Sequence, residues 1–414
     1  MIEEEYIRLI FGLKLKQIRT EKNLSLFGLA KITGLSKSYL NEIEKGKKYP
    51  KRDKIVLLSE ALETTYDQLV SLKLDKNLAP IGEILQSRIL KEIPLDVFGI
   101  KESDLIDIIA EAPVKVNAFI STLFEIAKHY NLTRESFFLA ALRSYQEANN
   151  NYFEEIELQV EKFAKAYSLD LNKRLNSKDF EEILVEEYGY TIENDELAQH
   201  KELNNLRSVF VPSSKTLLVS SETDDSQRMF IYAKEIAYNF LNITDRLFTF
   251  SWIKFDSFDQ VLNNFIASYF AGALLIPRKS LVASLKSFFD KKTFSTNDFQ
   301  MLMDGFTDSP ETFYQRLTNV LPKDFNLKNL FFLRFSYKPE RGDFQLTKEL
   351  HITNLLEPHA NERNEHYCRR WISLKTIQDL TETTENHVLD SQISSYHHTD
   401  NEYFVISSAT KDPF

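Results

Sequence analysis

The chain has 414 residues, of which 43% are hydrophobic and 27% are charged, as in folded globular proteins and unlike disordered chains. That length exceeds what one hydrophobic core normally serves, so we expect roughly two to four domains. The single cysteine, Cys368, excludes internal disulfides and any four-cysteine cluster supplied by one chain. No glycine-rich phosphate-binding motif occurs, which disfavours nucleotide hydrolysis and dinucleotide redox chemistry. We expect no cofactor.

Charge is distributed unevenly along the chain. Residues 1–75 carry 14 Lys and Arg against 11 Asp and Glu, a net +3, so the remainder must carry −13 to give the whole-chain −10. This asymmetry predicts a small polyanion-binding module on an acidic body, although a solvated surface would look the same. The start lacks the basic segment of a signal peptide, and the longest apolar run, at 265–277, is too short to cross a bilayer. We expect a cytoplasmic protein that does not contact membranes.

Residues 13–72 predict a small all-helical domain. Leucine and isoleucine recur there at helical intervals, enough for one core of five helices. The side chains expected in that core are Leu13, Ile18, Leu24, Leu29, Ile32, Leu35, Leu40, Ile43, Leu57, Leu58, Leu62 and Leu69.

Caps and turns mark the second and third helices of this domain. Ser25 and Ser36 stand where N-caps are needed, and Gly34 lies between them where a tight turn requires a positive φ. Gly46 is expected to stop the third helix. Two helices joined by such a turn are typical of a helix-turn-helix motif.

The third helix carries the residues that point to DNA. Leu40 and Ile43 face inward, which leaves the polar side chains of the helix facing outward. Lys, Ser, Asn and Tyr suit base edges in the major groove, and Lys47, Lys48 and Lys51 beyond the helix suit phosphates. Any small helical bundle could also carry such residues. The candidate DNA-binding residues are Ser36, Lys37, Ser38, Tyr39, Asn41, Lys45, Lys47 and Lys48.

The segment 29–50, LAKITGLSKSYLNEIEKGKKYP, resembles the lambda-repressor-like (XRE-type) helix-turn-helix family, including its S-x-x-x-L-x-x-I-E-x-G core. The resemblance covers most of residues 10–72. It implies binding to double-stranded DNA, usually as a two-fold dimer on half-sites ~34 Å apart. One departure is Leu26, where the family often has a phosphate-binding Gln, so that contact is missing or is made by a neighbour.

Residues 80–200 are predicted to be almost entirely helical. Apolar faces alternate with Glu and Lys faces, and Pro80, Pro94 and Pro113 break the run into short helices near its start. The Phe and Tyr side chains here are expected to fill a core or a dimer seam rather than a ligand pocket. We expect a helical linker or dimerisation region.

The pattern changes after residue 200. Segments 206–212 and 215–221 predict a hairpin, and a helix follows from about 225 to 242. With the apolar helix around 265–277, this order resembles the ImmA/IrrE-type metallopeptidase-like domain over about 180–280. The matching residues are Phe230, Ala233, Glu235, Ala267, Phe270, Ala271, Leu274, Leu275 and Pro277.

The departures from that family fall on its metal ligands. The two histidine positions hold Lys234 and Tyr238, and the third-ligand position holds Asn264. A catalytic zinc needs three protein ligands and an open water position. Lys234 carries its own positive charge, and Tyr238 could bind only as a phenolate, far below its reference pKa of ~10. The resemblance therefore implies a degenerate domain that is not an enzyme, with Glu235 left without its metal.

Lys234, Glu235 and Tyr238 are candidate ligand-binding residues. Lys234 and Tyr238 lie one turn apart on the face that would line the cleft, where they could hold a carboxylate or a phosphate. The alternative is that Lys234 pairs with Glu235 or another carboxylate and only stabilises the fold. We favour this structural role.

In the last third, segment 309–322 predicts an amphipathic helix, while segments 329–337 and 343–352 predict a strand pair. Arg369, Arg370 and Trp371 are candidates for binding an anionic ligand. Packing with surface salt bridges and a metal site are the alternatives. The metal site would use His359, His366, Cys368 and His397 or His398, whose spacing fits no standard zinc finger.

Together these parts resemble the short-chain acyl-CoA-responsive transcription regulators. We expect a mostly α chain with a smaller α+β part. The expected domains are the helix-turn-helix at 1–75, the helical region at 76–178, the degenerate domain at 179–280 and an α+β sensor-like module at 281–414. We expect a homodimeric transcription regulator on a pseudopalindromic operator, with a small acidic effector such as an acyl-CoA. The alternatives are a metallopeptidase-type anti-repressor and a constitutive repressor or adaptor.

Overall fold

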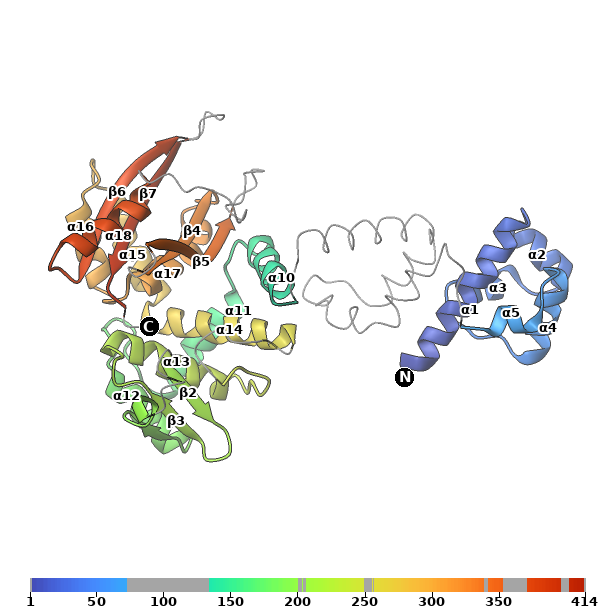
Figure 1. Cartoon of the computed structure of the whole chain (residues 1–414), viewed down its shortest axis with the longest axis horizontal. Coiled ribbons are helices and arrows are strands. Elements are labelled where there is room, and N and C mark those ends of the chain that lie inside the picture. Colours follow the sequence, from blue (N-terminus) through green and yellow to red (C-terminus); the bar gives the residue numbers. More distant parts are fainter. Residues whose placement is uncertain are drawn as a thin grey trace. The chain divides into compact units, whose positions relative to one another are not determined.

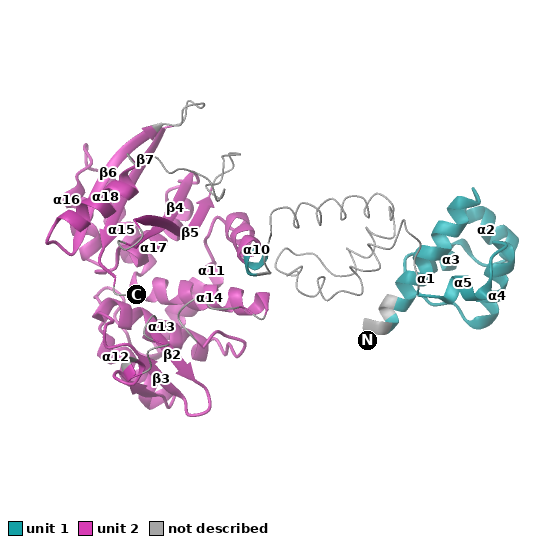
Figure 2. Ribbon diagram, viewed as in Figure 1, with its two compact units in different colours: residues 1–138 teal, residues 139–414 magenta. Residues whose placement is uncertain are grey.

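The computed structural model describes residues 2–72, 134–199, 203, 206–248, 255, 257–338, 342–352, 371–395 and 402–412. The chain divides into two compact units, residues 1–138 and 139–414 (Figure 2). Helices make up most of the described chain and strands a smaller part, which confirms the expected fold class. Residues 76–133 of the expected helical region lie outside the described residues.

The first unit contains the predicted helical domain, within residues 2–72. Its core is built from all five helices and includes Phe11, Leu29, Leu40, Leu58 and Leu69. Its helices are α1 (Ile2–Glu21), α2 (Leu26–Thr33), α3 (Lys37–Glu44), α4 (Arg52–Ala61) and α5 (Tyr66–Val70).

Two expected core residues of this unit are wrong. Leu57 is only half-buried and lies outside the core cluster, and Ile32 faces solvent. Ile32 is 57% exposed, because α2 packs through positions 26, 29, 30 and 33, and Ile32 falls outside that stripe. Three core residues that the spacing did not single out are Phe11, Leu15 and Ile55.

The predicted caps and the tight turn are confirmed. The Ser25 and Ser36 side chains accept hydrogen bonds from the backbone N–H groups of Gly28 and Tyr39, at 2.9 and 3.1 Å. Gly34 and Gly46 adopt φ values of 67° and 68°, which L side chains rarely reach. These local contacts fix where α2 ends and where α3 begins.

A buried ion pair ties α1 to α3. The Arg19 guanidinium donates to both Glu44 carboxylate oxygens, at 2.6 and 2.9 Å, and to the Leu24 carbonyl at 2.6 Å. A Cβ on Gly12 would lie 2.2 Å from the Ile43 carbonyl, so only glycine lets the two helices approach this closely. The position of α3 is thereby fixed from its C-terminal end.

The second unit is α+β. It begins within α10 (Arg134–Ala148) and continues through the elements shown in Figure 1. They are α11 (Glu154–Ala166), α12 (Ser177–Glu182), the π-helix Ile183–Glu187, β1 (Thr191–Glu193), the 3₁₀ helix Leu197–Gln199, β2 (Ser208–Val211), β3 (Thr216–Val219), α13 (Asp225–Phe240), α14 (Phe258–Leu275), α15 (Arg278–Phe289), α16 (Thr296–Asp304), α17 (Pro310–Asp324), β4 (Leu330–Lys338), β5 (Asp343–Ile352), α18 (Ile372–Glu382), β6 (His387–Ser395) and β7 (Glu402–Thr410).

Three small sheets are described in this unit. In the first, β3 lies between β1 and β2, parallel to β1 and antiparallel to β2, which confirms the hairpin predicted at 206–221. The pair β4–β5 confirms the strand pair predicted at 329–352, with a register shift between Arg334 and Phe335. The third sheet is the antiparallel pair β6–β7.

The α14 helix runs between two groups of elements (Figure 1). On one side it packs on α13 and α11, in a core that also includes β3 and α12. On the other side, α15, α16 and α17 form a second core. The first core includes Phe163 and Phe180, so it contains side chains from both sides of the expected domain boundary at 178/179.

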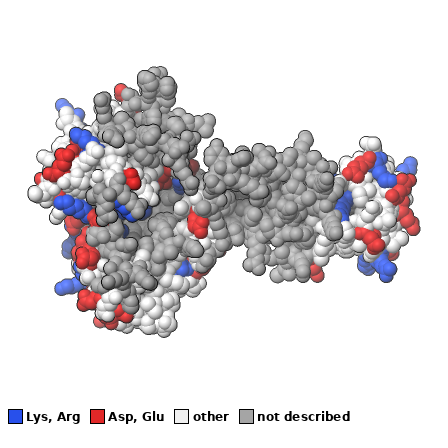
Figure 3. Space-filling view, viewed as in Figure 1, with Lys and Arg blue, Asp and Glu red and all other residues white. Residues whose placement is uncertain are grey.

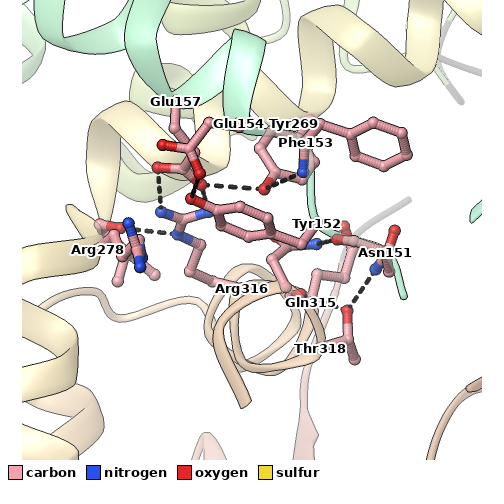
Figure 4. A network of polar contacts seen from close by, with 12 residues as sticks. Asn151, Tyr152, Phe153, Glu154, Glu157, Tyr269, Arg278, Gln315, Arg316 and Thr318 are labelled. Carbon is pink, nitrogen blue, oxygen red and sulfur yellow. Dashed lines mark hydrogen bonds and ion pairs between the residues drawn. The ribbon is translucent and has the colours of Figure 1, made fainter. Parts of the chain in front are cut away.

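A buried polar network joins α11, α14 and α17 (Figure 4). The fully buried Arg316 donates to both Glu157 carboxylate oxygens, at 2.6 and 2.9 Å, and to the Ile276 carbonyl at 2.9 Å. The Tyr269 hydroxyl donates to Glu157 at 3.0 Å and accepts the Phe153 backbone N–H at 3.2 Å. The network therefore connects the two cores through α14.

No single described helix is both long and apolar enough to cross a membrane. The pair α14 and α15, which is bent by 62° between them, passes that test only when the two helices are taken together, by length and composition.

Candidate nucleic-acid interface and a second site on α13

The outward face of α3 carries the predicted DNA-binding residues. Leu40 and Ile43 are fully buried, while Lys37, Ser38 and Asn41 on the same helix are exposed. This arrangement leaves an amine, a hydroxyl and an amide directed away from the core on one two-turn helix. Those are the groups that recognise base edges.

The other predicted residues of this face differ in their surroundings. Ser36 caps α3 with its side chain, so its first role is structural. Tyr39 is half-buried and packs against the core. Lys45 is half-buried, whereas Lys47 and Lys48 are exposed just beyond the helix. Lys48 forms an ion pair with Glu42 at 2.7 Å.

Charge on the first unit is mixed. Figure 3 shows Lys and Arg side chains interspersed with Asp and Glu over the visible face of this unit. Leu26, at the position of the family's phosphate-binding Gln, is half-buried and packs against the core. An apolar side chain there cannot donate to a phosphate, so phosphate contacts would depend on the lysines after α3.

The second site lies on α13, in the other unit. The three positions that the resemblance aligned with metal ligands meet there: Lys234 Nζ donates to Asn264 Oδ1 at 2.6 Å, and the Tyr238 hydroxyl donates to the same oxygen at 3.3 Å. Lys234 and Tyr238 lie one turn apart on α13, and Asn264 reaches them from α14. Two packed helices thus bring these residues together.

Glu235 is held by residues that the sequence analysis did not single out. Arg246 donates to its Oε1 at 2.5 Å, and the Tyr190 hydroxyl donates to its Oε2 at 3.0 Å. The Arg246 guanidinium also lies 3.9 Å from the centre of the Tyr238 ring, a cation–π contact. Asn239 donates to Tyr190 at 2.9 Å. An arginine in a loop gives no periodic signal, so only the fold reveals this partner.

Burial changes the proton affinities of this site. Removal from water lowers the pKa of Lys234 to about 7 against the raising effect of the Glu235 carboxylate, and the charge of Arg246 adds to the lowering. Burial raises the pKa of the Tyr238 hydroxyl, so this phenol keeps its proton at neutral pH. Burial likewise raises the pKa of the Tyr190 hydroxyl.

A small pocket opens beside these residues. The gap that its walls enclose has room for about one water molecule. Polar groups occupy one part of its wall and apolar side chains the rest. The lining residues are Ser208, Ile231, Lys234, Glu235, Tyr238, Leu247 and Phe248.

The residues of this site do not fit a catalytic zinc. Tyr238 keeps its proton, Lys234 exchanges between an ammonium and a neutral amine, and the Glu235 carboxylate is already engaged by Arg246. Within the described ranges, no group of three or more His, Cys, Asp or Glu side chains is placed to hold a metal.

The structure places only part of the C-terminal candidate site. Trp371 immediately precedes α18, and its ring meets Phe335 edge to face at 5.7 Å. Arg369 and Arg370 lie outside the described residues, and so do Cys368 and the histidines of the alternative metal site.

Comparison with known protein families supports the helix-turn-helix predicted in the first unit. Residues 15–69 match the helix-turn-helix family HTH_3, so the N-terminal unit contains a helix-turn-helix domain. No curated protein matches the chain. A solved structure, a Mycobacterium tuberculosis transcriptional regulator, is 18% identical over 64% of this chain and 72% of its own, with a TM-score of 0.44. That score is too low to carry an argument, so the family match alone supports a DNA-binding transcription regulator.

Proposed function

We propose that the chain is a sequence-specific DNA-binding transcription regulator that reads the major groove with α3. The observation that carries this proposal is the polar face of α3, with Lys37, Ser38 and Asn41 exposed over a fully buried Leu40 and Ile43, inside the segment that matches the helix-turn-helix family. An Asn amide suits an adenine, and a Lys suits a guanine. Lys47 and Lys48 then neutralise phosphates and set the register.

The test is a fluorescence-anisotropy titration of full-length protein with promoter DNA from its own locus, repeated over a range of salt. Replacing Lys47 and Lys48 by Ala should weaken binding to every sequence and reduce the salt slope by about one per lysine that contacts a phosphate. The matched control is Lys279→Ala, since Lys279 is exposed and lies on α15 of the other unit. An unchanged salt slope in the double variant would show that Lys47 and Lys48 do not contact phosphates.

The proposed assembly is a homodimer on a pseudopalindromic operator. It rests on the resemblance to lambda-repressor-like proteins, which pair two reading heads on half-sites one helical turn apart. Sedimentation of the full-length chain with and without operator DNA tests it. A monomer bound to a single half-site would contradict the assembly and leave groove reading intact.

For the second unit we propose a degenerate ImmA/IrrE-type domain that senses a small effector. Support comes from the meeting of Lys234, Tyr238 and Asn264, the three positions that would hold metal in that family, and from the pocket beside them. A protonated Lys234 would attract a carboxylate, and the Tyr238 hydroxyl would donate to it. An effector bound there would shift the population of DNA-binding conformations, for which ~2–3 kcal/mol of coupling is enough.

The size of the pocket limits that effector. The pocket as it stands holds about one water molecule, so even a short acyl group would require its walls to move apart, and the nucleotide and pantetheine parts of an acyl-CoA would have to lie outside. Thermal unfolding across a panel of short carboxylic acids and acyl-CoAs tests the proposal. Unchanged unfolding temperatures with the whole panel would contradict it and favour a constitutive repressor or adaptor.

We propose that the chain is not a peptidase, because amine, phenol and amide groups stand at the three metal-ligand positions. Elemental analysis of purified protein should find no stoichiometric zinc. One zinc per chain, bound after dialysis, would instead favour a metallopeptidase-type anti-repressor.

A further inference from the structure

We propose that strand β6 of the second unit is a dimer interface, which pairs with β6 of a second copy of this chain, antiparallel and centred on Ser391. The inference rests on the homodimer proposed above and goes beyond it by naming the surface and the register. Its test separates the failure of this surface from the failure of the assembly.

Strand β6 is the less buried member of a two-stranded ribbon (Figure 1). Within the part of the chain that the structure describes, β6 pairs with β7 and with no other strand. Buried and partly exposed residues alternate along β7, whereas none of residues 387–394 of β6 is buried. A ribbon of two strands is marginally stable in water by itself, so a further strand beside β6 would stabilise it.

The ribbon lacks the features that keep edge strands from pairing with other chains. Lysines, prolines and bulges protect the edges of natural sheets. The β4–β5 pair has such features, namely a register shift and five charged residues. The β6–β7 pair is regular over nine positions, and its two strands contain no Lys, Arg or Pro and only two acidic residues, Asp390 and Glu402. An edge of this kind is suited to strand addition.

Apolar side chains are exposed at one end of the same ribbon. Ile393 is 67% exposed, and Phe404, directly opposite on β7, is 52% exposed. The Phe294 ring meets Phe404 edge to face at 4.7 Å and is itself 38% exposed. Leu389, on the same face of β6 as Ile393, packs against the core of α15, α16 and α17. The apolar surface therefore reaches the end of the ribbon without being covered there.

The sequence of β6 is complementary to itself when the pairing is centred on Ser391. The two Ser391 residues then meet on the two-fold axis, and Leu389 of each copy lies opposite Ile393 of the other. Asp390 lies opposite Gln392, whose amide can donate to the carboxylate. Such a contact is isologous, as a two-fold dimer requires. Nine residues per strand give a shared edge of about 30 Å.

Charge and apolar pairing favour this register over its neighbours. Centring the pair on Asp390 would place the two Asp390 carboxylates opposite each other, which is destabilising. Centring it on Gln392 would place Ile393 opposite Ser391 and leave the isoleucine without an apolar neighbour across the axis. This self-complementarity is the reason for assigning the edge to a second copy and not to an unrelated peptide.

The first test is disulfide cross-linking of the full-length protein. Ser391→Cys in a Cys368→Ser background leaves one thiol per chain. On the proposed axis the two Cα atoms would lie about 4.5–5.5 Å apart, within the range of a disulfide. Copper–phenanthroline oxidation followed by non-reducing electrophoresis should give covalent dimers at least ~10-fold faster than Thr410→Cys in the same background, because pairing raises the effective concentration of the thiols. Thr410 is exposed at the end of β7.

The second test measures self-association without DNA by sedimentation velocity. Ile393→Lys should weaken the dimer at least ~10-fold, because it places a charge on the edge and removes both Leu389–Ile393 pairs. The side chain is 67% exposed in one chain, so the substitution should not disturb folding. The matched control is Leu158→Lys, since Leu158 is 47% exposed on α11, and this variant should dimerise as the wild type does.

The outcomes distinguish the surface from the assembly. A dimer that Ile393→Lys does not weaken, or cross-linking at position 391 no faster than at position 410, would overturn the pairing of β6 and leave the homodimer to another surface. A wild-type chain that stays monomeric with and without operator DNA would contradict both the surface and the proposed homodimer.

Discussion

The two candidate sites place their polar side chains in opposite environments. On α3, Lys37 and Asn41 are exposed and lie on one short helix. On α13, Lys234 is 6% and Tyr238 2% exposed, and their partners come from other elements. An exposed site suits a large partner that brings its own polar groups, whereas a buried site suits a small ligand and requires internal partners.

The largest expected effect comes from breaking the buried ion pair between Arg246 and Glu235 of α13. Arg246→Met leaves the Glu235 carboxylate buried without its guanidinium partner and should lower the free energy of unfolding by about 3–5 kcal/mol. Urea unfolding of the full-length chain measures it. The control is Arg278→Met, whose pair with Asp324 is partly exposed and should lose about 1 kcal/mol or less. Equal losses of unfolding free energy in the two variants would show that burial does not strengthen the contribution of these ion pairs.

The next effect is a pH dependence that only the buried lysine should produce. The pKa of Lys234 is about 7 in the folded chain against 10.5 ordinarily, so between these values the unfolded chain binds the extra proton. Stability of the wild type should therefore rise from pH 7 to 9, by up to about 1.4 kcal/mol per pH unit relative to Lys234→Met. Urea unfolding of both proteins at pH 7, 8 and 9 measures the difference. A constant difference would mean that Lys234 stays protonated.

On the exposed site, the expected effect falls on DNA affinity and not on folding. Asn41→Ala should weaken operator binding by about 1–3 kcal/mol, because the amide would lose its contacts with a base. The matched control is Asn297→Ala, an exposed helical Asn on α16 of the other unit. Anisotropy titrations at one salt concentration compare the two. An unchanged affinity in Asn41→Ala would exclude this residue from base reading.

The smallest effect concerns the start of the reading helix. Ser36→Ala removes the cap on the Tyr39 N–H and should lower the stability of the first unit by about 1 kcal/mol. Ser36→Gly should lose only a few tenths, since glycine is tolerated at an N-cap. Hydrogen exchange of α3 amides in the full-length chain measures both. Identical exchange in wild type and Ser36→Ala would show that the cap does not stabilise this helix.

The first unit could be predicted from sequence because its signals are local. Ser25, Gly34 and Ser36 act within a few residues of their own positions, and the structure bears them out. Ile32 was misplaced because eight residues define a helical stripe weakly, and tertiary packing then decides which face is buried.

The α13 site was only partly predictable. Spacing along a helix relates Lys234 to Tyr238, and the family resemblance suggested Asn264 as the third member. Nothing local pairs Glu235 with Tyr190, 45 positions away, or with Arg246 in a loop. Lys234 donates to the Asn264 amide oxygen, whereas the expected structural role paired it with Glu235 or another carboxylate, so its role stays a prediction.

The most direct test of the central claim is selection of DNA from a random-sequence pool by the purified full-length protein. A regulator that reads DNA through α3 should enrich one sequence, arranged as an inverted repeat with half-site centres ~34 Å apart. Selection with Asn41→Ala should lose or change the enriched base at one position of each half-site. Recovery of DNA without any enriched sequence, or the same enrichment with Asn41→Ala, would contradict the assignment of α3 as the element that reads DNA.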